Sequence, residues 1–174
     1  MTTGSIPKIL TRMTLPMMIG MISLVIFNLI DTLFVSRLGI LPLAAMAFTF
    51  PVVMVQSAFS AGLGVGASAI ISKAIGQKDF EKAKRFTTDS LILSFLIAVL
   101  LMIIGLSTID PLFSLLGVKG QALVLVKNYM RIWYFGLPFI VIPMVGNNAI
   151  RAAGNTFIPS AVMVIAVIVN ITLD

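Results

Sequence analysis

Two aspartates in the chain fall within strongly apolar segments, where an ionisable side chain is costly and is expected to serve a function. Asp31 lies in the first apolar run, and Asp174 closes the last one. Each follows an amide on the same helical face, since Asn28 precedes Asp31 by three residues and Asn170 precedes Asp174 by four. Carboxylates beside amides can hold a proton or coordinate a small cation. These residues therefore predict a proton or cation site in apolar surroundings.

The amino-acid composition excludes several classes of site and of protein. The chain has 174 residues with no cysteine and no histidine, which excludes a disulfide scaffold, a thiol nucleophile and a zinc–thiolate site. Hydrophobic residues make up 59% of the chain and charged residues only 10%, against about 25% charged in soluble domains. We therefore expect an integral membrane protein. The net charge of +6 comes from cations in short gaps between apolar runs, so nucleic acid is not an expected partner.

The elements that must position these side chains are membrane-spanning helices, each needing about 20 mostly apolar residues. The chain contains five such runs, and we expect an all-α integral membrane fold. The expected helices cover about residues 13–35, 43–71, 88–109, 125–150 and 158–174.

Charge placement predicts the orientation of these helices. The gap at residues 72–85 holds five Lys or Arg, and positive residues collect on the cytoplasmic side, so the amino terminus is expected to be cytoplasmic. Asp31 then lies 19 residues beyond Arg12, about 28 Å along a helix. Asp174 lies 15 residues beyond Pro159, about 22 Å. Both carboxylates fall in the outer half of the membrane and can share one site if the first and fifth helices are neighbours.

Simpler interpretations stay open for some of these residues. Asp31 can lie at the outer interface, solvated or paired with Arg37, and Asn28 can merely join helices through hydrogen bonds. The small-residue run Gly62–Gly66 predicts close helix packing, because a nucleotide-binding loop would need a strand and a soluble βαβ unit. Tyr129 lies among aromatic residues that are typical of a membrane interface.

Five segments, in this order and spacing, resemble the amino-terminal part of the multidrug and toxic compound extrusion family of transporters. The resemblance covers nearly the whole chain, and its strongest pieces are Asn28–Gly39, Gly62–Ser68, Gly76–Ala83, Arg151–Thr156 and Asn170–Asp174. It implies a twelve-helix transporter of two six-helix lobes, with residues 1–174 supplying the first five helices of the amino-terminal lobe. The family exports lipophilic, mostly cationic compounds in exchange for protons or sodium ions.

The resemblance also implies roles for individual residues. Asp31, Asn170 and Asp174 are expected to form the proton or sodium site, with Asp31 as the titrating group. Asn147 and Asn28 are expected to line the substrate cavity. The implied protein is not an enzyme and uses no cofactor beyond its coupling ion. Its expected partners are lipophilic cations, membrane lipid and a carboxy-terminal lobe, and its expected location is the inner or plasma membrane of the cell.

Other functions remain as alternatives. A flippase for lipid-linked saccharides would favour basic cavity residues, whereas the deep charges here are acidic. An intramembrane enzyme would have to work through paired aspartates alone. The chain can also be an inert or inhibitory partner in itself, although a carboxylate at residue 174 inside the bilayer leads us to expect that the polypeptide continues.

Overall fold

Five α-helices make up the computed structural model, which describes the backbone of residues 6–173 and the side chains of residues 10, 11 and 14–172. Four of the helices are long and apolar enough to cross a membrane, and the fifth is a shorter apolar helix. The helices are α1 (Ile6–Arg37), α2 (Ile40–Gly76), α3 (Phe80–Leu115), α4 (Gly120–Ala152) and α5 (Phe157–Leu173).

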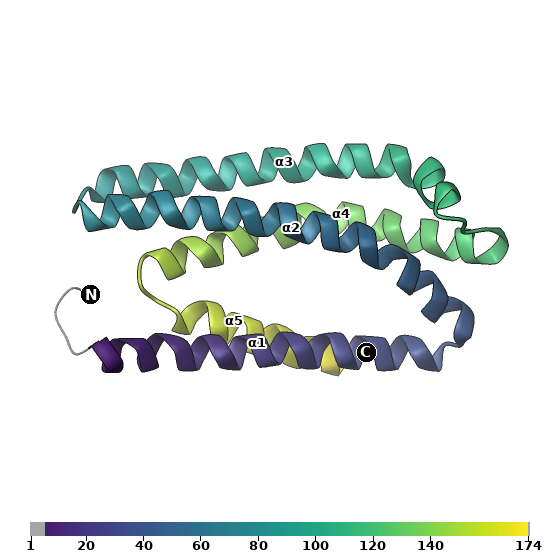
Figure 1. Cartoon of the computed structure of the whole chain (residues 1–174), viewed down its shortest axis with the longest axis horizontal. Coiled ribbons are helices and arrows are strands. Elements are labelled where there is room, and N and C mark those ends of the chain that lie inside the picture. The colour runs from purple at the N-terminus through teal and green to yellow at the C-terminus, as the bar shows by residue number, and fades with distance from the viewer. Residues whose placement is uncertain (1–5, 174) are drawn as a thin grey trace.

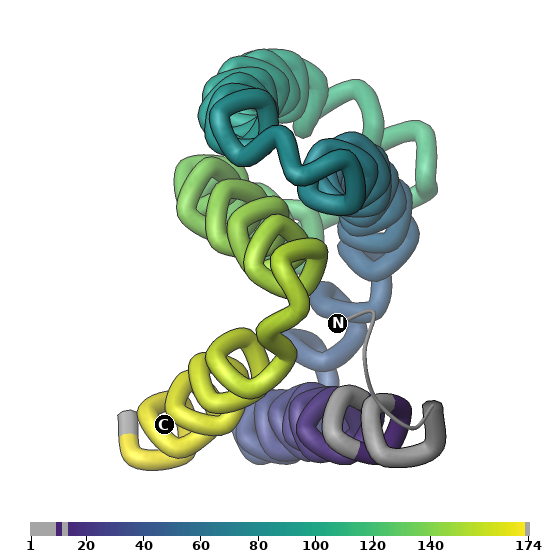
Figure 2. Tube along the Cα trace, turned by 90° about the vertical axis from the view of Figure 1, so that its left-hand side faces the viewer, coloured from purple at the N-terminus to yellow at the C-terminus, as the bar shows by residue number. Residues whose placement is uncertain are grey.

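The helices form two layers (Figures 1 and 2). Helices α2, α3 and α4 pack on one another, while α1 packs mainly on α5 and runs parallel to it (Figure 1). The α1–α5 pair touches the three-helix bundle only sparsely, where α1 meets α2 and α4 meets α5. The first and last helices of the chain are therefore neighbours, as a site shared between them requires.

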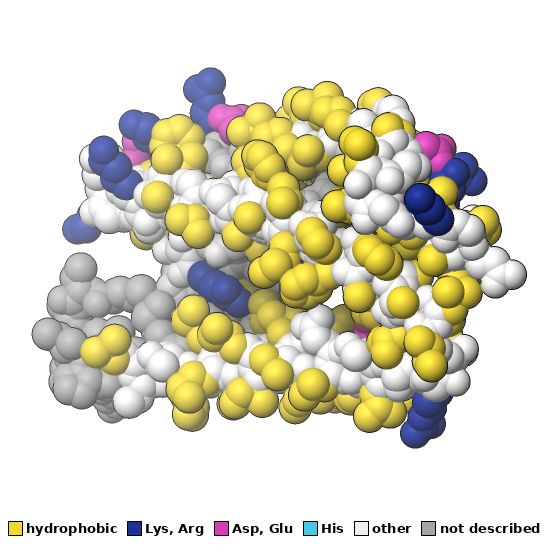
Figure 3. Space-filling view, turned by 45° about the vertical axis from the view of Figure 1, so that its right-hand side comes forward, with side chains coloured by type: hydrophobic (Ala, Val, Ile, Leu, Met, Phe, Trp, Pro, Cys, Tyr) yellow, Lys and Arg dark blue, Asp and Glu magenta, His cyan; other side chains and the backbone are white. Residues whose placement is uncertain are grey.

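Helix α4 lies at the centre of the bundle and contributes to both buried apolar clusters. One cluster includes Met130 of α4 with Phe113 of α3, and both side chains are fully buried. The other includes Leu137 and Val141 of α4 with Ala98 of α3. Most large apolar side chains elsewhere are exposed, as expected of helices that face lipid. Figure 3 shows these side chains spread over both layers.

Three glycines mark the closest approaches between helices. A Cβ at Gly105 of α3 would collide with the ring of Tyr134, and a Cβ at Gly64 of α2 would collide with the side-chain amide of Asn148. A Cβ at Gly20 of α1 would meet two side chains of α5. The predicted close packing of the Gly62–Gly66 run therefore occurs at Gly64, where α2 meets α4.

The turn between α2 and α3 is short and tightly hydrogen-bonded. Lys78 adopts a left-handed conformation with φ of 60°, and its N–H donates to the Ile75 carbonyl at 2.9 Å. The N–H of Asp79 donates to the Ala74 carbonyl at 3.0 Å, which completes a Schellman motif. The Asp79 carboxylate then caps α3 by accepting from the N–H of Lys82 at 3.0 Å.

Candidate functional site

Asp31 lies on α1, toward the end that leads into α2, and its side chain is half-buried. It interacts electrostatically with the phenol of Tyr129, which belongs to α4. The surroundings of Asp31 therefore include its own helix, α1, and Tyr129 of α4 in the other layer.

The contact at Gly20 sets the register between α1 and α5. A Cβ at Gly20 would lie 3.1 Å from the Sδ of Met163 and 3.4 Å from the Oγ of Ser160. These two α5 residues lie on the same helical face, three positions apart. Because the helices run in the same direction (Figure 1), equal numbers of residues beyond this contact reach similar heights.

Asn170 lies at the height of the polar residues on α1. At 1.5 Å per residue, Asn28 lies about 12 Å beyond the Gly20 contact and Asp31 about 16 Å beyond it. Asn170 lies about 11–15 Å beyond the same contact on α5. The fold thus places Asn170 on the helix adjoining Asp31, at about the height of Asn28 and about 1–6 Å short of the height of Asp31.

The carbonyl oxygen of the Asn170 side chain is buried and has no hydrogen-bond partner among the residues that the structure describes. A buried acceptor without a partner costs about 1–3 kcal/mol, so such groups call for a proton donor or a cation. This unsatisfied oxygen is the strongest sign of a ligand position in the α1–α5 pair.

Asn28 has a different environment. Its side chain is exposed, and its Nδ2 donates to the Leu24 carbonyl of its own helix at 2.8 Å. Thr32 in turn donates from its hydroxyl to the Asn28 carbonyl at 2.7 Å. The amide of Asn28 therefore bonds within α1. Its oxygen is left as an acceptor.

The two asparagines of α4 also differ from each other. Asn148 packs against Gly64, and its Nδ2 donates to the Met144 carbonyl at 2.9 Å. Asn147 is half-buried. The cavity-lining role expected for Asn147 stays a prediction.

Asp174 lies outside the described residues, so the predicted site is seen only in part. Within the described part of the chain, no three Asp or Glu side chains lie together in a group able to hold a metal ion. The sodium site expected at Asp31, Asn170 and Asp174 remains a prediction.

Two residues of α4 gain importance from the fold that sequence patterns did not assign to them. Tyr129 fits the pattern of an interfacial aromatic residue, and nothing in its spacing places it near Asp31. Arg151 fits the pattern of a cytoplasmic cation, but it lies in the last turn of α4. Its Nη2 lies 3.9 Å from the Sδ of Met163 on α5, and its Nε is buried with no hydrogen-bond partner in the described part of the chain.

These features define a multi-pass helical membrane protein whose candidate polar groups lie on α1, α4 and α5. The MatE family model matches residues 16–174, so the chain belongs to this family of transporters, as its motifs predict. Its expected location in a membrane is confirmed with the family.

Among its relatives is an FAD transporter of Shewanella oneidensis, 41% identical over 99% of this chain and 38% of the relative. Another is the multidrug export protein MepA of Staphylococcus aureus, 29% identical over 96% of this chain and 37% of MepA.

The fold is shared with solved transporters. One, from Pyrococcus furiosus, is a MOP superfamily transporter described as having a binding pocket of reverse polarity that suggests a different function. It is 40% identical, with a TM-score of 0.89 over 94% of this chain and 36% of that one. The chain thus spans less than two-fifths of the length of the curated relatives it matches.

Proposed function

We propose that the chain belongs to a secondary antiporter that exports lipophilic, mostly cationic compounds in exchange for protons or sodium ions. In this proposal residues 1–174 supply five helices of the first of two six-helix lobes, with the amino terminus in the cytoplasm of a plasma-membrane protein. Family membership supports the transport role. The unpartnered oxygen of Asn170 on the helix adjoining Asp31 carries the assignment of the coupling site.

Charge explains how this site would act. An ionised Asp31 attracts a cationic compound, and a proton or sodium ion that reaches the carboxylate neutralises it and weakens that attraction. Asn170 would accept a hydrogen bond from the protonated carboxyl or supply an oxygen ligand to sodium. Asp174 is proposed as the second carboxylate of the site. Tyr129 would donate a hydrogen bond toward Asp31 when the carboxylate is ionised.

Transport by the whole protein in sealed vesicles tests the coupling site. We expect Asp31→Asn and Asn170→Ala to lose most export of a fluorescent lipophilic cation, under a proton gradient or under a sodium gradient. Asp110→Asn is the matched control, because Asp110 is exposed and pairs with Lys127 of α4, away from α1. Equal export by Asp31→Asn and Asp110→Asn, at equal amounts in the membrane, would refute the assignment.

A flavin dinucleotide is a second candidate substrate, favoured by the position of Arg151. Its guanidinium lies between α4 and α5, and its Nε has no partner. Arginine suits phosphate groups because its planar fork donates two parallel hydrogen bonds. The 41% identical relative is named an FAD transporter, and FAD carries a pyrophosphate.

Transport of FAD and of the lipophilic cation, measured in parallel, distinguishes the flavin candidate from the cation exporter. If the anion is the substrate, Arg151→Gln lowers transport of FAD, followed by flavin fluorescence, while Arg151→Lys keeps much of it. Arg131→Gln serves as the control, because Arg131 is an exposed cation of the same helix. FAD transport that is absent from the parent, or unchanged in Arg151→Gln, would reject the flavin candidate and leave the cation exporter standing.

A further inference from the structure

The α2–α3 hairpin forms a small basic pocket away from the proposed transport site. Its cavity of about 240 Å³ is lined by residues from the end of α2 and the start of α3. Polar and apolar side chains alternate around it, and none of them is acidic. The lining residues are Ile70, Lys73, Ala74, Gln77, Lys82 and Phe86.

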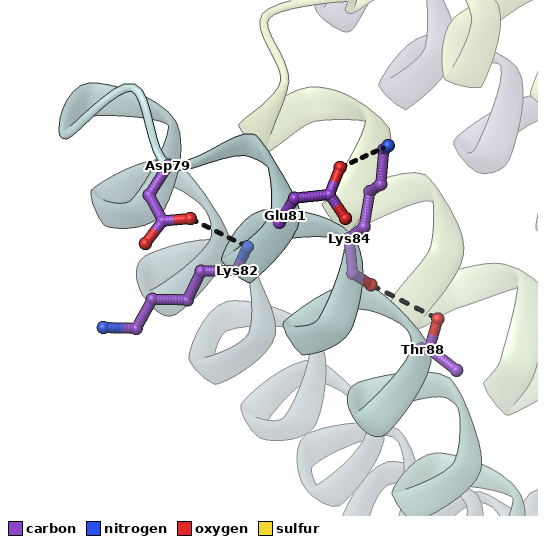
Figure 4. A network of polar contacts seen from close by, with 5 residues as sticks. All are labelled: Asp79, Glu81, Lys82, Lys84 and Thr88. Carbon is purple, nitrogen blue, oxygen red and sulfur yellow. Dashed lines mark hydrogen bonds and ion pairs between the residues drawn. The ribbon is translucent and has the colours of Figure 1, made fainter.

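The acidic residues of this segment are engaged elsewhere. Figure 4 shows Glu81 paired with Lys84, at 2.8 Å, on the opposite side of the first turn of α3 from the Lys82 side chain. The carboxylate of Asp79 accepts from the backbone N–H of Lys82 as the helix cap. The remaining carboxylate, that of Asp89, lies 3.8 Å from Arg85.

The two lysines of the pocket keep their charge uncompensated. No ion pair to Lys73 or Lys82 occurs among the residues that the structure describes. The ammonium of Lys82 lies 5.7 Å from the ring centroid of Phe86, which lines the same cavity. This cation–π contact holds one face of the ammonium and leaves its other N–H donors for a ligand.

The pocket also has the apolar wall that a lipid needs. Ile70 is 43% exposed, and Phe86 presents its ring beside the charged groups. The segment between residues 72 and 89 carries five Lys or Arg and three Asp or Glu, so its excess charge is positive. Figure 3 shows basic side chains gathered at one end of the α2–α3 layer, next to apolar ones. Basic pockets at the ends of membrane helices suit anionic head groups.

We propose that this pocket binds the phosphate of an anionic phospholipid in the cytoplasmic leaflet. The ammonium groups of Lys73 and Lys82 would contact the phosphate, and the amide of Gln77 would donate a hydrogen bond to it. An acyl chain would follow Ile70 and Phe86 into the membrane. The proposal depends on charge at the hairpin and is independent of the exported compound.

Native mass spectrometry of the purified whole protein tests the site with phosphatidylglycerol and phosphatidylcholine as probes. A Lys73→Gln and Lys82→Gln double variant should bind phosphatidylglycerol about tenfold to thirtyfold more weakly. The reason is that each basic residue near a membrane surface contributes to the free energy of binding an anionic lipid. Binding of phosphatidylcholine should change little. The matched control is Lys78→Gln with Lys84→Gln, which removes the same charge from the same hairpin outside the pocket.

Each of the other outcomes supports or contradicts the assignment of the pocket as an anionic phospholipid site. Equal weakening in both double variants would overturn the pocket, because it would indicate diffuse attraction to a basic hairpin. Displacement of the lipid by equimolar inorganic phosphate would overturn the lipid assignment in favour of a soluble phosphate. Lys73→Arg with Lys82→Arg should restore binding. Failure of this restoration, with native elution and helix content, would also contradict the proposal.

Discussion

Alanine at Gly64 should destabilise the protein, whereas alanine at its neighbours Gly62 and Gly66 should not. In a helix without tertiary contacts, Gly→Ala stabilises by about 1 kcal/mol. At Gly62 and Gly66 a Cβ would meet no atom within 4 Å, so the helical gain should be kept. At Gly64 a Cβ would lie 3.1 Å from the Cγ of Asn148 and nearer still to its Nδ2.

The expected change in the free energy of unfolding of Gly64→Ala follows from the interactions that Asn148 would lose. Its amide has to move, which breaks the 2.9 Å hydrogen bond from Nδ2 to the Met144 carbonyl, a net loss of about 1 kcal/mol. Inserting a methyl group into a packed interface costs about 1–3 kcal/mol more. After subtracting the helical gain, Gly64→Ala should lower the free energy of unfolding by about 1–3 kcal/mol.

Thermal unfolding in detergent, followed by circular dichroism, measures the difference. On the scale of domains of 150–250 residues, Gly64→Ala should lower the Tm by about 2–12 °C, and each control should leave it unchanged or raise it by up to about 4 °C. Asn148→Ala removes the obstructing amide, so adding Gly64→Ala to it should cost little. Additive losses in this double-mutant cycle, or a Gly64→Ala variant as stable as Gly62→Ala, would refute the packing argument.

Two further substitutions test the packing and the turn in the same unfolding assay. Gly105→Ala should cost about 2–3 kcal/mol, because the ring of Tyr134 occupies the Cβ position and is only 3% exposed; Gly136→Ala, with nothing within 4 Å, is its control. Lys78→Gly should stabilise by about 0.5–1 kcal/mol, because φ of 60° strains any residue with a Cβ, and Lys78→Ala should not.

Apolar runs located the helices well because burial in lipid depends on composition over about 20 residues. They do not mark where a helix ends in water. The third helix was expected from about residue 88, yet α3 begins at Phe80. Asp79 caps it there and the Glu81–Lys84 pair supports its first turn, so the helix extends beyond its apolar run. A hydropathy pattern does not detect such polar stabilisation of a helix end.

The candidate site could be predicted only as a set of residue types. Asn28 and Asn170 each precede an aspartate by about one turn, and their sequence contexts look alike. In the fold, the Asn28 amide bonds to Leu24 of its own helix, whereas the Asn170 oxygen is buried without a partner. The difference arises from neighbouring helices, and a single sequence does not show that α1 packs on α5.

The proposed coupling residues lie in a different layer from the buried apolar clusters. The buried apolar clusters lie within α2, α3 and α4, whereas Asp31 and Asn170 lie on the α1–α5 pair, which has few contacts with that bundle. Elements with few buried contacts open and shift at the lowest cost in free energy. In the proposed mechanism, neutralising Asp31 would therefore act where movement disturbs the apolar core least. Helix α4 belongs to the bundle yet places Tyr129 near Asp31 and Arg151 near α5, so any shift of the pair changes these polar contacts.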